Sequence, residues 1–313
     1  MIKRISLSQN VAANQATLRV DQAAVLLFPE YSRARLQQWI KTGELTVDDA
    51  RTKPSARLNG GESMRIEAQM IPVGEVMPQA IPLEIVFEDQ HLLVLNKPAG
   101  LVVHPAAGNW NSTLQNALLY HDPDMDVLPR SGIVHRLDKD TSGVMVVARS
   151  LKAHASLVEQ LQTRSMSRTY EAVVKGATPP SGTVVAAIGR NPRERKKMAV
   201  VKGGKPATSH YTLLRHLPGA SHVEVALESG RTHQIRVHMT HIGFPIVGDP
   251  LYGRGLIRQK GLPRVAVAAI NDFPRQALHA RTLKLIHPES GEQYEFHAPL
   301  AKDMAHLLET LHA

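Results

Sequence analysis

The chain has 313 residues, of which 43% are hydrophobic and none is cysteine. At roughly 100–200 residues per domain, this length predicts one large and one small domain or two equal ones. The absence of cysteine excludes disulfides and thiolate metal sites and fits a reducing cytoplasm, which is the predicted location. No apolar run reaches the roughly 18 residues of a transmembrane helix. The first twenty residues lack the apolar core and the cleavage site of a signal peptide, so no signal peptide is expected. No membrane partner is expected either.

The chain is basic, with 37 lysines and arginines against 28 acidic residues and a net charge of +9. Basic proteins commonly bind polyanions, because their positive potential speeds the encounter. Charge alone does not decide between a nucleic-acid partner and none.

The sequence of the N-terminal part predicts a lead-in segment followed by a small compact unit. Residues 1–14 show no helical period and are expected to be extended. Residues 15–75 predict a compact unit that ends in a linker, since three prolines occur between residues 70 and 82. Ser32 is the expected N-cap of the second helix and Gly43 its stop. The expected helices cover residues 19–27 and 33–42, and the expected strands cover residues 44–47 and 64–66.

A larger domain is expected over residues 83–313. Its predicted strands come both in runs and in alternation with helices. This order is typical of an α+β fold with a mixed, mainly antiparallel sheet flanked by helices. Strands are expected over residues 83–87, 92–96, 144–148, 169–174, 207–214, 223–227, 278–286 and 293–297, and helices over residues 113–120, 151–161, 232–241 and 303–311.

The polar run from His135 to Gly143 directly precedes the expected buried strand 144–148. Loops anchored on rigid sheets are where catalytic groups concentrate. The run holds two carboxylates, Asp138 and Asp140. An isolated loop of this kind is compatible with a catalytic site and with an ordinary solvated turn.

The run from Gly230 to His238 follows the expected strand 223–227 and opens a helix. On a helix, Ile235 and Arg236 share a face with Thr232, because residues three and four apart are neighbours. The nearby histidines lack the i, i+4 spacing and the acidic partner of a zinc site, so no metal is expected. An ordinary basic helix start is the alternative interpretation.

Together with several other runs, these two motifs resemble the large-subunit ribosomal RNA pseudouridine synthases of the RluA superfamily. Several motifs in the same order are more specific than any single one. Residues 15–66 resemble the S4 RNA-binding module, a small α/β domain that precedes the catalytic domain in this subfamily, although Asp48-Asp49 replaces its usual Asn-Gly turn. The matching runs are Asn96–Gly100, His104-Pro105, Gly132–Gly143, Tyr170–Val173, Gly230–His238, Gly248–Gly253 and Arg275–Ala280.

The resemblance implies an isomerase that converts uridines of 23S ribosomal RNA to pseudouridine without a cofactor. Asp138 matches the catalytic aspartate of the family, and Arg236 matches the arginine that pairs with it. Arg136 matches the arginine that fills the gap left by a flipped base. Tyr170 and Ile235 match the residues on the two faces of the uracil. The implied partner is large-subunit RNA, free or in assembling subunits, and the expected oligomeric state is a monomer.

Three cations of the small unit are expected to contact RNA phosphates: Arg33, Arg35 and Lys41, which lie on or beside the predicted helix 33–42. Arg168 stands where the family often has lysine, so the charge is kept but the geometry can differ.

Other functions remain open from the sequence. The same chemistry could act on a different RNA, such as transfer RNA, although an S4-like unit favours ribosomal RNA. A non-catalytic ribosome-assembly factor would not need an intact set of Asp138, Tyr170 and Arg236. A nucleoside hydrolase usually needs a second carboxylate at a defined separation, which no motif supplies.

Overall fold

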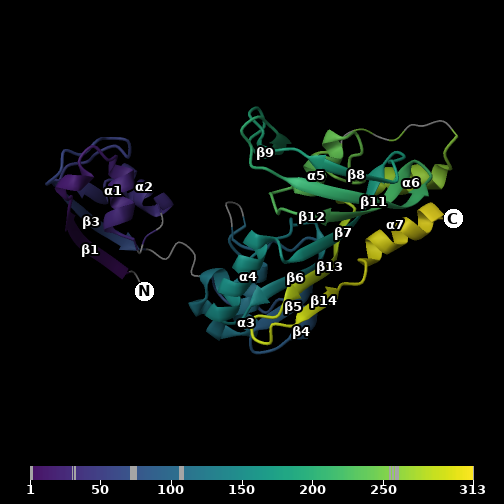
Figure 1. The fold of residues 1–313 in the computed structure, drawn as a ribbon, viewed down its shortest axis with the longest axis horizontal. Coiled ribbons are helices and arrows are strands. Elements are labelled where there is room, and N and C mark those ends of the chain that lie inside the picture. The colour runs from purple at the N-terminus through teal and green to yellow at the C-terminus, as the bar shows by residue number, and fades with distance from the viewer. Residues whose placement is uncertain are drawn as a thin grey trace. The chain divides into compact units, whose positions relative to one another are not determined.

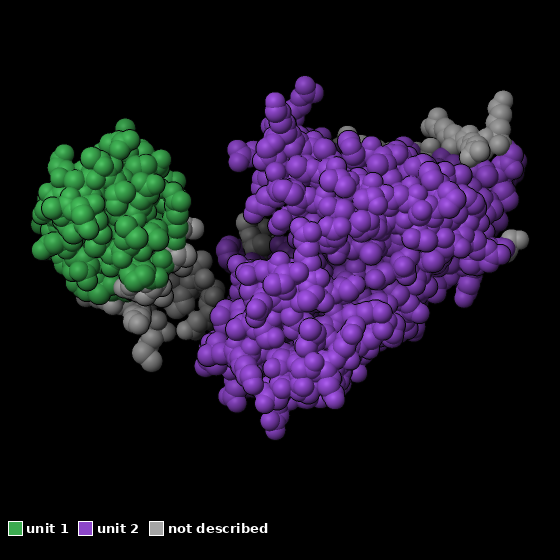
Figure 2. Space-filling view, in the orientation of Figure 1, with its two compact units in different colours: residues 1–75 green, residues 76–313 purple. Residues whose placement is uncertain are grey.

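The computed structural model describes residues 3–29, 31, 33–70, 76–105, 109–253, 255, 257 and 261–312. The chain divides into two compact units, residues 1–75 and residues 76–313, which Figure 2 shows in different colours. Each unit has its own hydrophobic core. No helix in the described part of the chain is both long and apolar enough to cross a membrane.

The first unit packs helices on a three-stranded antiparallel sheet (Figure 1). On α2, Leu36, Trp39 and Ile40 are buried, because apolar residues at this spacing share one face of a helix. The strand order is β1 (Lys3–Asn10), β3 (Ser63–Met70), β2 (Leu45–Val47), and the helices are η1 (Ala13–Gln15, 3₁₀), α1 (Val20–Leu27) and α2 (Arg33–Thr42).

The expected lead-in, residues 1–14, is largely a strand of this sheet. β1 pairs with β3 in a continuous antiparallel register from Lys3–Met70 to Asn10–Ser63. The extended conformation was predicted, but the pairing joins segments more than fifty residues apart, which local patterns do not reveal. The expected cap Ser32 and residues 71–75 of the expected linker lie outside the described residues.

The second unit is built on one nine-stranded sheet. β13 pairs in parallel with β6, and the other pairings of this sheet are antiparallel. The predicted α+β fold with a mixed sheet is therefore confirmed. In order across the sheet the strands are β4 (Ile85–Glu88), β5 (Leu92–Lys97), β6 (Ser142–Ala148), β13 (Leu278–Ile286), β7 (Ser167–Lys175), β12 (Ala220–Leu227), β11 (Thr208–Leu217) and β8 (Ser181–Val185), and β14 (Gln293–His297) also pairs with β13.

Helices lie beside both halves of this sheet. In Figure 1, α3 and α4 accompany β4, β5 and β6, whereas α5 and α6 lie near β8 and β11. The sequence did not predict α6 or the short strands β8, β9 and β10, which offer few residues for a periodic pattern. The remaining elements are α3 (Leu114–His121), η2 (Pro123–Val127), η3 (Pro129–Gly132), α4 (Leu151–Thr163), β9 (Ile188–Arg190), β10 (Met198–Val200), α5 (Gln234–His241), α6 (Arg264–Asp272) and α7 (Lys302–His312).

The junction of β6 and β13 positions the loop that precedes β6. All seven residues of β6 are buried, as expected for a strand covered on both faces. Gly143 has φ 117°, and a Cβ there would lie 2.2 Å from the carbonyl oxygen of Ala280. Only glycine allows this approach of the two backbones, so the loop ends at a closely packed point of the sheet.

Candidate active site

One pocket of about 300 Å³ in the second unit gathers the residues that the sequence singled out there. They come from the loop before β6, from β7 and from the start of α5, and Asp138 and Arg236 are 98 residues apart in the chain. The fold therefore brings distant motifs into one site. The predicted residues that line it are Arg136, Asp138, Tyr170, Ile235 and Arg236.

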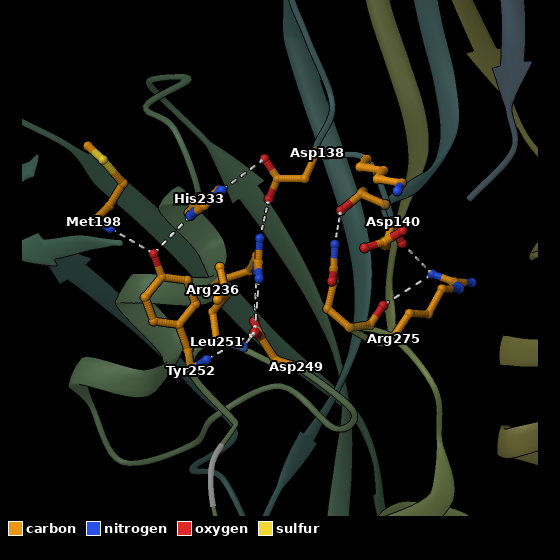
Figure 3. A network of polar contacts seen from close by, with 12 residues as sticks. Asp138, Asp140, Met198, His233, Arg236, Asp249, Leu251, Tyr252 and Arg275 are labelled. Carbon is orange, nitrogen blue, oxygen red and sulfur yellow. Dashed lines mark hydrogen bonds and ion pairs between the residues drawn. The ribbon is translucent and has the colours of Figure 1, made fainter. Parts of the chain in front are cut away.

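Arg236 connects two carboxylates at the base of this site (Figure 3). Its Nη1 donates to Oδ2 of Asp138 at 2.9 Å. Its Nε and Nη2 donate to the two carboxylate oxygens of Asp249 at 2.7 and 2.9 Å. This bidentate contact fixes the plane of the guanidinium, so the nitrogen that faces Asp138 has a defined direction.

The three charged groups differ in exposure. The Asp249 side chain is fully buried, that of Arg236 is 5% exposed and that of Asp138 is 16% exposed. Burial alone would lower the pKa of Arg236, but Asp249 and Asp138 together raise it above its ordinary value. Arg236 therefore remains a cation, and Asp138 is the end of the network that reaches the pocket.

Asp249 also organises the backbone around it. Its Oδ1 accepts hydrogen bonds from the backbone N–H groups of Leu251 and Tyr252, at 2.9 and 3.0 Å. Gly248 before it has φ 71°, and a Cβ there would lie 2.1 Å from the carbonyl oxygen of Arg275. The sequence analysis assigned no role to Asp249. Its position inside one of the matching runs was the available signal.

The loop that carries Asp138 is tethered to the end of β5. Lys97 is fully buried, and its Nζ donates to the carbonyl oxygens of Pro98, Leu101 and Lys139 at 2.7, 2.9 and 3.0 Å. Burial lowers the pKa of Lys97 to about 7, although the nearby Asp140 and Asp138 favour its charged form. The lysine thus serves as a hydrogen-bonded structural anchor directly beside the loop that carries Asp138.

A second tether reaches the loop from the segment before β13. Arg275 Nη1 donates to the carbonyl oxygen of Asp140 at 3.0 Å. The same guanidinium makes a bidentate contact with Asp303 at 2.6 and 2.7 Å, at the start of α7. Both tethers end on the two residues that follow Asp138, so buried basic side chains hold this side of the loop in place.

Apolar side chains form part of the pocket wall, beside charged ones such as Arg168 and Arg231. Tyr170 on β7 is 7% exposed and Ile235 on α5 is 4% exposed. Burial raises the pKa of the Tyr170 phenol, so this ring is neutral at physiological pH. Arg136, in contrast, is exposed beside the pocket.

Two further pocket histidines are held neutral. The backbone N–H of Val146 donates to Nε2 of His135 at 3.2 Å, so this nitrogen carries a lone pair. Burial, assisted by Arg168, lowers the pKa of His135 to about 3. Burial also lowers the pKa of His104 to about 4, with Arg136 contributing.

The three predicted phosphate contacts belong to the first unit. Arg33 is 60% exposed and also donates to the buried Asp21 at 3.0 Å, so part of its guanidinium is engaged. Lys41 is exposed at the end of α2. Arg35 lies in α2, and its side chain is outside the described part of the structure.

Comparison with known proteins identifies the family. Residues 91–241 match the family model for RNA pseudouridylate synthase. The chain is 55% identical over 297 residues to ribosomal large subunit pseudouridine synthase D of Pseudomonas aeruginosa, covering 94% of this chain and 92% of that protein. It is 46% identical to the protein of the same name from Escherichia coli K12, covering 100% of this chain and 96% of that one.

A solved structure agrees with these sequence matches. Human RNA pseudouridylate synthase domain containing 1 is 28% identical, has a TM-score of 0.54 and covers 75% of this chain and 96% of its own. The chain belongs to the RNA pseudouridylate synthase family, within its RluA branch. It is an RNA pseudouridine synthase of the type that modifies large-subunit ribosomal RNA.

The neutral state of His135 predicts how stability depends on pH. An unfolded histidine titrates near ~6.5, well above the folded value of about 3. Between these two values the unfolded state binds a proton that the folded state does not bind. The stability that the neutral His135 provides is therefore fully present above pH ~6.5 and is lost as the pH falls toward the folded pKa. Replacing His135 by glutamine, whose oxygen can still accept from Val146, should reduce the slope of the unfolding free energy between pH ~6 and ~4 by up to about 1.4 kcal/mol per unit.

Urea unfolding of the second unit at several pH values measures this slope. His241→Gln, at an exposed position on α5, is the matched control and should keep the wild-type slope. Equal slopes for His135→Gln and the wild type would contradict the neutral state of His135 in the folded protein.

Proposed function

We propose that this enzyme converts specific uridines of large-subunit ribosomal RNA to pseudouridine by base flipping, with Asp138 as the essential catalytic group. The observation that carries the proposal is that Asp138 is the one acidic residue among those lining the pocket, and that a buried arginine holds it at 2.9 Å. Tyr170, Ile235 and Arg136 then act on the substrate base and on the RNA around it.

The reaction breaks the C1′–N1 bond of the uridine and forms a C1′–C5 bond. As the first bond breaks, positive charge develops on the sugar, as it does in glycoside hydrolysis. A carboxylate beside C1′ can stabilise this charge or act as a nucleophile. Asp138 supplies that group, and Arg236 fixes its orientation.

The atoms of the reaction balance without a cofactor. Carbon 5 loses a proton after the new bond forms, and N1 gains one, so no electrons enter or leave. The detached uracil must stay in the pocket, and water must stay out. The buried side chains of Tyr170 and Ile235 fit this need, since they offer apolar surface on which a planar base can pack.

A uridine inside a stacked RNA cannot reach a pocket of this kind. Flipping it out costs a few kcal/mol of stacking and pairing energy. Arg136 is exposed and adjoins Asp138 in the lining of the pocket. We infer that its guanidinium fills the space that the base vacates and offsets part of that cost.

We assign RNA affinity to the first unit, as an S4-like module. One helix of this unit, α2, carries two basic residues: Lys41, which is exposed, and Arg33, which also pairs with Asp21. The names of the relatives support large-subunit ribosomal RNA as substrate. We propose that this is the 23S RNA, free or in assembling subunits. We further propose that the enzyme acts as a monomer in the cytoplasm. In the alternative form of this proposal the substrate is transfer RNA, and the experiments below distinguish the two substrates.

The first test is the substitution Asp138→Asn. The amide keeps the size of the side chain but removes the charge that the sugar requires, so we expect at least about a thousandfold loss in single-turnover rate. Tritium release from RNA labelled at uracil carbon 5 measures the rate, on 23S fragments and on transfer RNA. Asp126→Asn, at an exposed position in η2, is the control. A rate within about tenfold of the wild type would contradict the assignment.

The second test is deletion of residues 1–75. If the first unit supplies affinity, the deletion should weaken RNA binding and reduce its dependence on salt, because fewer phosphates are neutralised. The single-turnover rate at saturating RNA should remain within about threefold of the wild type. Loss of chemistry at saturation, in a second unit that circular dichroism shows to be folded, would refute this division of roles.

A further inference from the structure

The Asp138 carboxylate is held on one oxygen only. Oδ2 accepts a hydrogen bond from Arg236, whereas Oδ1 has no hydrogen bond to any described residue. The group that faces Oδ1 is His233, whose Nε2 lies 3.8 Å away (Figure 3). This distance exceeds a direct hydrogen bond, and a small rotation of either side chain would close it.

His233 is held in an unusual backbone conformation. It has φ 58°, in the left-handed region, immediately before the first residue of α5. For a residue other than glycine this conformation is strained by about 1 kcal/mol or more, and such strain clusters at functional sites. The left-handed residue also explains why α5 begins at Gln234 instead of at the predicted Thr232.

Tyr252 determines which nitrogen of His233 carries the proton. The backbone N–H of Met198 donates to the Tyr252 hydroxyl oxygen at 2.8 Å, and Nδ1 of His233 lies 2.8 Å from the same oxygen. Tyr252 has no other acceptor among the described residues, so its own hydrogen points to Nδ1. This tautomer places the ring N–H on Nε2, which faces Asp138.

The segment of residues 249–252 supports the donors for both oxygens of Asp138. Asp249 fixes Arg236 with both of its oxygens and also accepts from the backbone N–H of Tyr252. The Tyr252 ring lies 5.1 Å from the guanidinium carbon of Arg236. Residues 249–252 therefore direct one donor to Oδ2 and a second donor toward Oδ1.

We propose that His233, oriented by Tyr252, is a positioning residue that donates its Nε2–H to the free oxygen of Asp138 when RNA is bound. With Arg236 on Oδ2 and His233 on Oδ1, the carboxylate cannot rotate away from the sugar. The inference rests on the catalytic role proposed for Asp138.

The charge state of His233 is consistent with this role. Burial lowers its pKa, while Asp138 opposes the shift. The other groups that face it are Arg236, Asp249, Arg136 and Tyr252. The ring is thus a neutral N–H donor at physiological pH and adds no second positive charge beside Arg236.

Two substitutions at His233 separate positioning from mere packing. His233→Ala removes the donor and should lower the single-turnover rate at saturating RNA by about tenfold or more, with RNA affinity within about twofold. His233→Gln can place an amide N–H near the position of Nε2 and should recover at least about threefold of the loss. His241→Ala, an exposed histidine of the same helix, is the control. An unchanged rate in His233→Ala, or equal loss in both variants, would overturn the proposal.

Tyr252→Phe gives an independent test that holds even if His233→Ala fails to fold. The ring over Arg236 is kept, but the hydroxyl that orients His233 is lost, so the rate should fall. In the double variant with His233→Gln, the loss of rate should be clearly smaller than the two single losses combined, because both changes act on the same donor. Fully additive losses would show that Tyr252 does not act through His233.

Wild type and Asp138→Asn are assayed alongside. An inactive wild type, or an active Asp138→Asn, would refute the proposed function itself. An active wild type with an inactive Asp138→Asn and an unaffected His233→Ala would refute only the positioning role of His233.

Discussion

The site depends on one buried ion pair, between Asp249 and Arg236. Burying two charges costs several kcal/mol, and only close geometry and further hydrogen bonds offset that cost. Here both carboxylate oxygens engage the guanidinium, and one also accepts from two backbone N–H groups. The pair therefore fixes the direction of the nitrogen that faces Asp138. Removing either partner would leave an uncompensated charge in the interior and would release the Asp138 carboxylate.

The fold supports this pair by holding the Asp138 loop independently. Lys97 anchors the loop from β5, and Arg275 anchors it from the segment before β13. The parallel contact of β6 with β13, which Gly143 permits, sets the point at which the loop leaves the sheet. Distant segments thus converge because the sheet orders them. The Asp138 carboxylate, bonded to Arg236 through one oxygen, faces a pocket that is lined in part by apolar side chains.

Much of this architecture could be predicted from the sequence, and the failures have physical causes. Long periodic elements such as β13 and α7 were found with nearly correct bounds, because their patterns are local. β1 was expected to be extended but not paired, since pairing with β3 is a long-range property. The motifs located the pocket residues, yet no role was predicted for Asp249 or Tyr252. Their function comes from contacts across the fold with Arg236 and His233, which spacing along the chain does not encode.

The most direct measurement of the central role of the buried pair is the single-turnover rate of Asp249→Asn at saturating RNA. Asparagine can still accept from the backbone N–H groups of residues 251 and 252, so the turn is retained, but the charge that fixes Arg236 is lost. We expect a rate at least about a hundredfold below the wild type, with RNA affinity changed by less than about threefold. A rate within about twofold of the wild type, in a folded variant, would show that Asp138 does not depend on the pair.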